Sequence, residues 1–206
     1  MTRHAVDVFA DVVCPFTHVG FRRFVGRRGE VGMSLPLLRV HAWPLELVNA
    51  QPFDPETVAR HVHELRSQVA PDLFAHFTPD AVPATSMPAF ALAAEAYAVG
   101  DALGEAVSLA IRSALFEDGD DIADPEVLAD VAAAHGIDGV GTDAELVVAL
   151  DYEEGRRRDV QGSPEFFLDD RSYFCPGLRI DGSDDEMVIE PDVARFDAFL
   201  IDCFTT

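Results

Sequence analysis

Strand-like alternation is concentrated near the two ends of this chain, and it constrains the fold more than any other feature. Residues 5–10 alternate apolar and polar side chains and stop at an Asp-Val-Val-Cys-Pro segment, residues 11–15. We expect a helix from Pro15, because proline is favoured at the first helical position. Residues 34–41 predict a second strand, and Pro36 places it at a sheet edge. Strand, helix and strand in this order predict a parallel strand pair.

The middle of the chain is patterned as helix. Proline, aspartate and glycine divide it into segments expected at 55–70, 88–99, 101–116, 124–135 and 142–158. Strand patterns return at 165–168 and 172–175, which predict a hairpin. A last helix is expected from Glu190–Pro191 to Cys203.

These elements predict an α/β protein, a thioredoxin fold with a large inserted α-helical domain. Residues 1–50 and 160–206 would form the thioredoxin-like domain, and residues 51–159 the inserted helical domain. The 206 residues are 49% hydrophobic, which is enough for a substantial core.

Charge and hydropathy argue against two kinds of partner. The chain has 37 acidic and 15 basic side chains, a formal net charge of −22, and all the basic residues are arginine. A negative field of this size repels phosphate backbones, and residues 156–158 form too short a basic run for a nucleic-acid groove. No apolar stretch approaches the roughly 18 residues of a membrane-spanning helix. We therefore expect neither nucleic acid nor membrane as a partner, and the sequence leaves the oligomeric state open.

The cysteines suggest a reducing compartment. Cys14, Cys175 and Cys203 are odd in number and far apart in sequence, which does not resemble a disulfide framework. Residues 1–4 run directly into the first predicted strand, without the apolar core of a signal peptide. The expected location is cytoplasmic.

Three motifs carry a family resemblance. Residues 11–20 (DVVCPFTHVG) resemble the active-site loop of DsbA-like thioredoxin-fold proteins, in which Cys-Pro-x-Cys opens the first helix. Residues 161–168 (QGSPEFFL) resemble the loop that carries a cis-proline in that family, and residues 174–178 (FCPGL) resemble the segment after the hairpin. The resemblance covers nearly the whole chain, and it implies that Pro164 is cis and that Ser163 faces the Cys14 sulfur.

One position departs from the family motif. Thr17 stands where a dithiol oxidoreductase has its second cysteine, so Cys14 lacks the usual nearby partner. Relatives with this fold, the kappa-class glutathione transferases and the hydroxychromene-carboxylate isomerases, have serine at the position of Cys14 and bind the thiol of glutathione. This chain therefore matches neither pattern fully.

Cys14 is the predicted nucleophile. A thiol at a helix N-terminus faces unpaired N–H groups and the positive end of the helix dipole, which favour the thiolate and lower the pKa. Thr17 could donate a hydrogen bond to the thiolate, and His18 could add positive charge. The alternative is that Cys14 is a buried apolar side chain and Thr17 a packing residue.

The predicted site contains further residues. The catalytic set is Cys14, Thr17 and Pro164, and the predicted substrate-binding residues are Pro15, Phe16, His18, Trp43, Ser163 and Cys175. Phe16 and Trp43 are expected in the apolar wall of a cleft. Cys175 is expected to line the site rather than to pair with Cys14, because a strand lies between them. Cys203 is expected in the core. The histidines show no metal-ligand spacing, so no metal is expected.

The predicted activity is thiol–disulfide exchange through Cys14 and a mixed disulfide with a small thiol or a protein thiol. No tightly bound cofactor is expected, although a low-molecular-weight thiol could serve as co-substrate. One alternative is a glutathione-transferase-like or isomerase-like enzyme that uses a bound thiol cofactor. The other is a non-catalytic thioredoxin-fold binding module.

Overall fold

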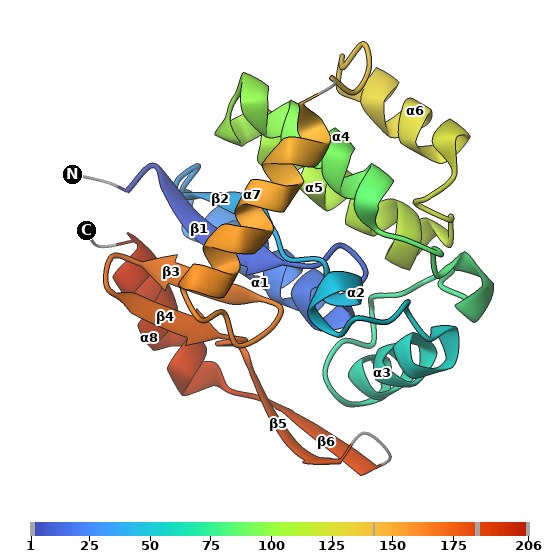
Figure 1. Ribbon diagram of the computed structural model, residues 1–206. Coiled ribbons are helices and arrows are strands. Elements are labelled where there is room, and N and C mark those ends of the chain that lie inside the picture. The colour runs from blue at the N-terminus through green and yellow to red at the C-terminus, as the bar shows by residue number, and fades with distance from the viewer. Residues whose placement is uncertain (1–2, 142, 184–185, 205–206) are drawn as a thin grey trace.

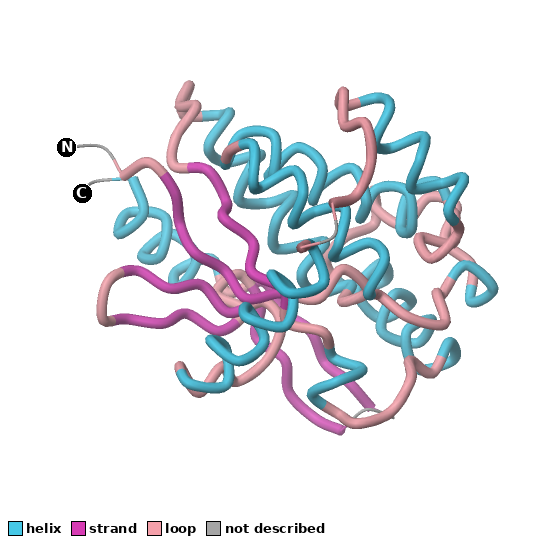
Figure 2. The backbone as a smooth tube through the Cα atoms, turned by 45° about the horizontal axis from the view of Figure 1, so that its top comes forward, coloured by secondary structure: helices cyan, strands magenta, loops and turns pink. Residues whose placement is uncertain are grey.

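A four-stranded sheet in the order β2-β1-β3-β4 forms the centre of the protein, and a separate two-stranded sheet, β5-β6, extends from it (Figures 1 and 2). The computed structural model describes residues 3–141, 143–183 and 186–204. The strands are β1 (Ala5–Ala10), β2 (Leu37–Ala42), β3 (Glu165–Leu168), β4 (Arg171–Phe174), β5 (Leu178–Ser183) and β6 (Glu186–Pro191). As predicted, β1 pairs in parallel with β2, which is an edge strand, and β3 and β4 form a hairpin.

Proline sets the start of several helices. The helices are α1 (Pro15–Glu30), α2 (Leu45–Val48), α3 (Pro55–Gln68), α4 (Met87–Val99), α5 (Asp101–Ser113), α6 (Pro125–Ala134), α7 (Ala144–Arg157) and α8 (Val193–Phe204). A 3₁₀ turn (Pro79–Ala81) precedes α4, and a π-helical turn (Ala114–Asp118) follows α5. Asp54 caps α3 by accepting a hydrogen bond from the Thr57 N–H, which stabilises that helix start.

The alternation of β1 sends its side chains to two different layers. Val6, Val8 and Ala10 are buried in a core with Phe24 of α1 and Phe199 of α8. Asp7 and Phe9 face the opposite layer, where α7 crosses in front of the sheet while α8 lies behind it (Figure 1). Each face of the sheet is therefore covered by helices.

The link between α7 and the sheet depends on close packing and a partly buried ion pair. The Asp151 carboxylate accepts hydrogen bonds from the His41 Nδ1 at 2.8 Å and from the Ala42 N–H at 2.9 Å. Burial acts to lower the pKa of His41, but its hydrogen bonds to Asp151 and Asp7 prevail and raise the pKa to about 9. His41 is therefore charged at neutral pH, which holds β2 to α7.

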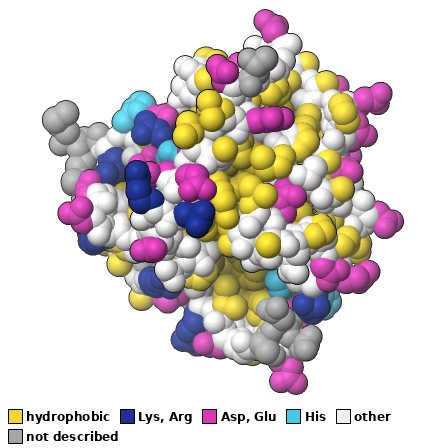
Figure 3. All heavy atoms as spheres, in the orientation of Figure 1, with side chains coloured by type: hydrophobic (Ala, Val, Ile, Leu, Met, Phe, Trp, Pro, Cys, Tyr) yellow, Lys and Arg dark blue, Asp and Glu magenta, His cyan; other side chains and the backbone are white. Residues whose placement is uncertain are grey.

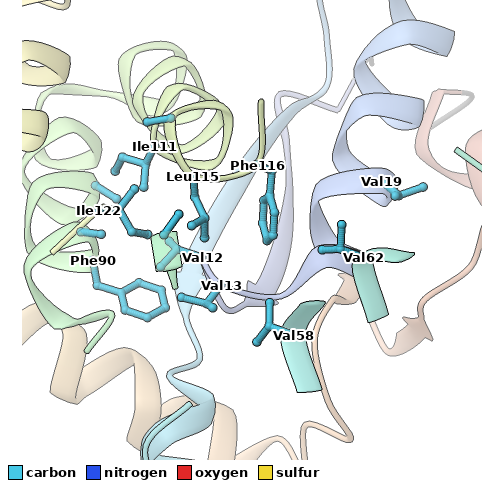
Figure 4. Close-up of a cluster of buried hydrophobic side chains, with 14 of the residues drawn as sticks. Val12, Val13, Val19, Val58, Val62, Phe90, Ile111, Leu115, Phe116 and Ile122 are labelled. Atoms are coloured by element: carbon cyan, nitrogen blue, oxygen red, sulfur yellow. The ribbon is translucent and has the colours of Figure 1, made fainter. Parts of the chain in front are cut away.

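A second core joins the segment ahead of α1 to the helical region. Val12 and Val13 are buried among Val58 of α3, Phe90 of α4 and Ile111 of α5 (Figure 4). Burying a valine side chain contributes about 1.5 kcal/mol or more. These contacts fix the position of the segment that leads into Cys14.

The structure confirms most predicted elements and corrects two. The α/β thioredoxin fold with inserted helices is present, and the predicted helices of the middle region appear as α3 to α7. The last helix begins at Val193 rather than at Glu190, because residues 186–191 form strand β6, which pairs antiparallel with β5. This strand pair was not predicted from the sequence. Thr142, the predicted start of α7, lies outside the described residues. The division into domains at residues 51 and 159 stays a prediction.

A substitution at Gly155 of α7 tests how closely this helix packs on the sheet. A Cβ at Gly155 would lie 2.5 Å from ring atoms of Trp43, whereas a Cβ at Gly26 of α1 would meet no heavy atom within 4 Å. Alanine favours a helix by about 1 kcal/mol relative to glycine. We predict that Gly155→Ala destabilises the protein by about 1–3 kcal/mol, as overpacking does.

The matched control is Gly26→Ala, which should stabilise the protein by up to about 1 kcal/mol, since the helix preference acts there without a clash. Urea unfolding of the two variants and the wild type measures both effects. Equal stabilisation by the two substitutions would contradict the packing described for Trp43.

Candidate functional site

Cys14 occupies the N-cap of α1, and Pro15 is the first residue of that helix. The Cys14 carbonyl accepts the first helical hydrogen bond, from the His18 N–H at 3.2 Å. The Cys14 side chain is 5% exposed, and its thiol donates a hydrogen bond to the Ser163 carbonyl oxygen over 3.2 Å. The sulfur is therefore held between the start of α1 and the loop ahead of β3.

Ser163 connects three segments of the site. Its hydroxyl accepts a hydrogen bond from the Asp11 N–H at 2.8 Å and shares another with the Thr17 hydroxyl, also at 2.8 Å. The Ser163–Pro164 peptide bond is cis, and Pro164 is buried beside Gly20 of α1. The structure thus brings Cys14, Thr17, Ser163 and Pro164 to one place.

The environment of Cys14 corrects the expected lowering of its pKa. Burial raises the pKa of the Cys14 thiol above its ordinary value, although hydrogen bonds from Thr17 and Ser163 partly oppose this. The negative charge of Asp11 acts in the same direction as burial. The prediction from the helix N-terminus assumed an exposed thiol, and desolvation outweighs the helix effect here.

Asp11 is a buried carboxylic acid three residues before Cys14. Its two oxygens accept hydrogen bonds from the Val13 N–H and the Leu45 N–H, both at 2.6 Å. Burial raises the pKa of Asp11 to about 7, although these hydrogen bonds and the charge of Arg112 act to lower it. Asp11 can therefore change its protonation state near neutral pH, close to the Cys14 sulfur.

Arg112 of α5 is a fully buried cation behind the same segment. Its guanidinium donates to the Asp11 carbonyl oxygen at 3.1 Å and to Ser108, and it lies 4.8 Å from the centroid of the Phe21 ring. Burial lowers the pKa of Arg112 to about 10, while the charges of Tyr97, Asp11 and Cys14 oppose this. At neutral pH Arg112 is charged, and it attracts a negative charge on either Asp11 or Cys14.

Asp11 and Arg112 are not among the site residues predicted from the sequence. A signal for each exists in the sequence. Asp11 directly follows the first strand, and Arg112 lies on the buried face of α5, one turn after Ser108 and next to Ile111. A charged residue on an apolar face is buried at a cost, so it indicates a paired or functional group.

A cleft of about 270 Å³ opens at Cys14. Pro15 and Phe16 of α1 line it, and their predicted role in substrate binding stays a prediction. The opposite side comes from α2, from the segment that follows it, and from the first turns of α3. The complete lining is Val13, Cys14, Pro15, Phe16, Leu45, Glu46, Asn49, Gln51, Pro52, Phe53, Asp54, Thr57, Val58, His61 and Ser163.

His18 does not line this cleft. It is 2% exposed, lies between the rings of Phe74 and Phe116, and bonds through Nε2 to Glu117 at 2.6 Å. Burial lowers the pKa of His18, and the hydrogen bond from His18 holds the pKa of Glu117 at about 2 against the effect of burial. A neutral imidazole thus donates to an ionised carboxylate, so the expected positive charge beside Cys14 is wrong.

Trp43 also lies outside the cleft, contrary to the prediction. Its ring is 4% exposed and packs against Phe9 and Tyr152, on the face of the sheet that α7 covers. The long-range contact with α7 buries this side chain, and the local sequence gives no sign of that contact. Trp43 therefore supports the fold and does not reach the substrate cleft.

Cys175 is close to the site but on the other side of Pro164. Its N–H donates to the Pro164 carbonyl oxygen at 2.9 Å, and its side chain lines a small separate cavity with Pro164, Gly20 and Arg23. Burial raises the pKa of Cys175 to about 12. Cys203 is fully buried in the core with Phe199, as expected, and all three cysteines are free thiols.

The described residues include no group of three or more histidine, cysteine or acidic side chains that could hold a metal ion. In the same part of the chain, no helix has the length and apolar character needed to cross a membrane.

Comparisons with known proteins agree with this fold. The family described as DSBA-like thioredoxin domain matches residues 5–190, and the chain therefore belongs to this family. No curated protein sequence matches it.

Two solved structures of one protein are among the similar ones. The cytosolic disulfide reductase DsbM from Pseudomonas aeruginosa with GSH is 20% identical, with a TM-score of 0.63 over 82% of this chain and 88% of that chain. A second structure of DsbM is 19% identical, with a TM-score of 0.62 over 95% and 96% of the two chains.

A third structure, a 2-hydroxychromene-2-carboxylate isomerase, is 17% identical, with a TM-score of 0.59 over 82% of this chain and 88% of that chain. At these identities the likeness shows a common fold.

The raised pKa of Asp11 predicts a specific pH dependence of stability. Because its pKa rises from 3.8 to about 7 on folding, the folded protein binds the proton more tightly than the unfolded chain. The stability from this group is therefore present below about pH 4 and is lost as pH rises to about 7, with a slope of up to about 1.4 kcal/mol per pH unit.

Asp11→Asn should remove this slope, although it should also destabilise the protein at every pH, because the amide leaves a backbone N–H unpaired. Denaturant unfolding between pH 4 and pH 8 measures the difference from wild type, and Asp72→Asn, at an exposed carboxylate, controls for the loss of one acidic group. A wild-type minus Asp11→Asn difference that stays constant over this range would disprove the account of Asp11.

Proposed function

We propose that this protein is a thiol–disulfide exchange enzyme that uses Cys14 as its single active-site thiol. The main support is the position of Cys14 at the N-terminus of α1, on the wall of a cleft, with Thr17 in place of a second cysteine. Family membership supports an oxidoreductase-type enzyme. The similarity to a disulfide reductase agrees with this activity, although that likeness carries the fold alone.

The proposed reaction has two exchanges. The Cys14 thiolate attacks one sulfur of a disulfide, so that a Cys14–sulfur bond forms, the original sulfur–sulfur bond breaks, and the other half leaves as a thiolate that takes up a proton. A second thiol then attacks the mixed disulfide and releases Cys14. Because Thr17 cannot perform this second attack, a small thiol or a protein thiol must do so.

The inserted helical region contributes one wall of the proposed active-site cleft. Residues of α3 and of the segment before it form one wall of the cleft, while Cys14 and Ser163 form the other. We therefore propose that the region 51–159 acts as the cover of a thioredoxin-like domain. A cytoplasmic setting suits the mechanism, since a reducing compartment supplies the small thiol that releases Cys14.

Identification of the adduct tests this function. Treatment with hydroxyethyl disulfide should add one half-molecule per chain, and peptide mass spectrometry should place it on Cys14. Cys14→Ser should lose the adduct and all catalysed exchange, whereas Cys175→Ser should keep both. An adduct on Cys175 instead, or catalysis that survives Cys14→Ser, would reject the proposal.

The transferase-like or isomerase-like alternative makes a different prediction in the same assays. Such an enzyme would need a thiol for turnover but no disulfide, and the Thr17 and Ser163 hydroxyls would bind the thiol of the cofactor. Turnover that needs a thiol and persists in Cys14→Ser without any disulfide would favour this alternative.

The substitution Thr17→Cys tests whether the missing second cysteine is what limits the protein to exchange through a single thiol. Residues 14 and 17 are one helical turn apart, within the separation that a disulfide tolerates. The variant should form an internal disulfide and reduce insulin, while the wild type shows little insulin reduction without added small thiol. Thr17→Ser is the control, because it keeps the hydroxyl and adds no thiol.

If Thr17→Cys forms the disulfide but gains no exchange activity, the cleft serves another reaction. If the wild type already reduces insulin alone and loses this activity in Cys175→Ser, the distant cysteine is the second thiol, and the single-thiol mechanism is wrong.

A further inference from the structure

The cleft at Cys14 has an uneven charge. Two carboxylates line it, Glu46 of α2 and Asp54 at the start of α3, together with neutral polar groups of Asn49, Gln51 and Thr57. Among the described residues that line it there is no arginine, and the whole chain has no lysine. His61 is the single lining side chain, within the described residues, that can become a cation.

Both carboxylates are held in place. One oxygen of Glu46 accepts hydrogen bonds from the Thr85 hydroxyl, the Ser86 N–H and the Ser86 hydroxyl at 2.8–2.9 Å. Asp54 accepts from the hydroxyl and the N–H of Thr57, at 2.6 and 3.2 Å. Hydrogen bonding to Thr57 lowers the pKa of Asp54, so this group stays ionised at neutral pH. Neither charge can turn away from an incoming substrate without losing these bonds.

Positive groups near the cleft compensate these charges in part. Arg60 Nη2 lies 3.5 Å from the Thr57 hydroxyl, and its charge lowers the pKa of Asp54. The N-terminus of α1 carries a partial positive charge, and Arg112 is buried behind the loop with Asp11 against it. Arg60 and Arg112 do not line the cleft, so the start of α1 is the one of these positive groups that reaches it. The protein as a whole carries a formal net charge of −22.

We infer that the cleft selects its low-molecular-weight thiols and disulfides by charge, and that it accepts cationic ones in preference to anionic ones such as glutathione, with uncharged ones between them. This inference rests on the proposed function of Cys14. Like charges repel an anionic disulfide from Glu46 and Asp54 as it approaches, whereas a terminal ammonium group can pair with either carboxylate. The amides of Asn49 and Gln51 can bind polar groups of any such molecule.

The reacting step is the first exchange of the proposed mechanism. The Cys14 thiolate bonds to one sulfur of a symmetrical disulfide, and the other half leaves as a thiolate and is protonated by solvent. Cys14 is oxidised to the mixed disulfide while the leaving sulfur is reduced. The reaction therefore needs no reagent besides the disulfide.

Rates of this step with three disulfides test the inference. The reagents are cystamine, which is doubly cationic, hydroxyethyl disulfide, which is uncharged, and glutathione disulfide, which carries net negative charge. Intact-mass measurements over time give the rate constant for modification of Cys14 in each case. Division by the rate constant with free mercaptoethanol removes the intrinsic reactivity of each disulfide.

At low salt we expect the corrected rate constant for cystamine to exceed that for glutathione disulfide by about tenfold or more. High salt should reduce this ratio severalfold, because the Debye length falls from about 10 Å at 0.1 M to about 3 Å at 1 M ionic strength. A ratio near one, or faster reaction with glutathione disulfide, would overturn the inference.

Charge-neutral variants separate the cleft from the charge of the whole protein. Glu46→Gln and Asp54→Asn should each reduce the cystamine-to-glutathione ratio at least about twofold, and both side chains keep an oxygen that can accept the existing hydrogen bonds. Glu126→Gln, at an exposed position on α6, removes the same charge far from the cleft lining and should not reduce the ratio. Equal effects of all three variants would mean that the net charge, rather than the cleft, makes the selection.

Failure of the inference and failure of the proposed function would give different results in these experiments. If Cys14 reacts with none of the three disulfides, the exchange function itself is wrong. If Cys14 reacts with all three and glutathione disulfide is the fastest, the function stands and charge selection is rejected.

Discussion

The segment between β1 and α1 is held by buried polar contacts, and the geometry of the site depends on them. The Asp11 carboxylate binds the N–H groups of Val13 and Leu45, while Arg112 binds the Asp11 carbonyl oxygen and Ser163 binds the Asp11 N–H. These bonds connect the segment to α2, to α5 and to the loop before β3. Because buried polar groups are costly when unpaired, loss of one contact would disturb the others.

This network has chemical consequences for Cys14. A buried acid and a buried guanidinium lie within electrostatic reach of the sulfur, and their charges act on its pKa in opposite directions. Burial is the larger effect, so the thiol form of Cys14 is favoured over the thiolate. A single thiol of this kind is protected from unwanted oxidation. It also depends on the cleft to bring in the right partner, and the carboxylates of Glu46 and Asp54 give that cleft its selectivity.

Local patterns in the sequence were sufficient to predict most of the fold. Proline at helix starts, alternation in β1 and the aromatic residues of β3 act within a few residues, so the elements they define could be located. The strand pair β5-β6 escaped prediction although residues 178–181 alternate apolar and polar side chains, because the alternation is short and the pair is largely exposed. Cys14, Phe16 and Ser163 could be placed in the site, because motifs at fixed spacing carry them.

The positions of the other residues predicted for the site, and of Arg112, depend on contacts between distant parts of the chain. His18 turns away from the cleft because Glu117, far along the sequence, accepts its hydrogen bond, and Trp43 is buried because Gly155 allows α7 to approach. Arg112 is near Cys14 because α5 packs behind the loop. No local pattern specifies such pairs, which explains why the raised pKa of Cys14 could not be predicted from its position at a helix start.

The pH dependence of Cys14 alkylation tests the central claim, that burial rather than the helix N-terminus governs this thiol. Peptide-resolved iodoacetamide labelling gives a rate constant for Cys14 at each pH, and the rate follows the thiolate fraction. We predict a rate that continues to rise with pH and has its midpoint above 9.0, the ordinary value for a cysteine thiol. A midpoint at or below about 7, as in thiols that are activated at helix N-termini, would contradict the account.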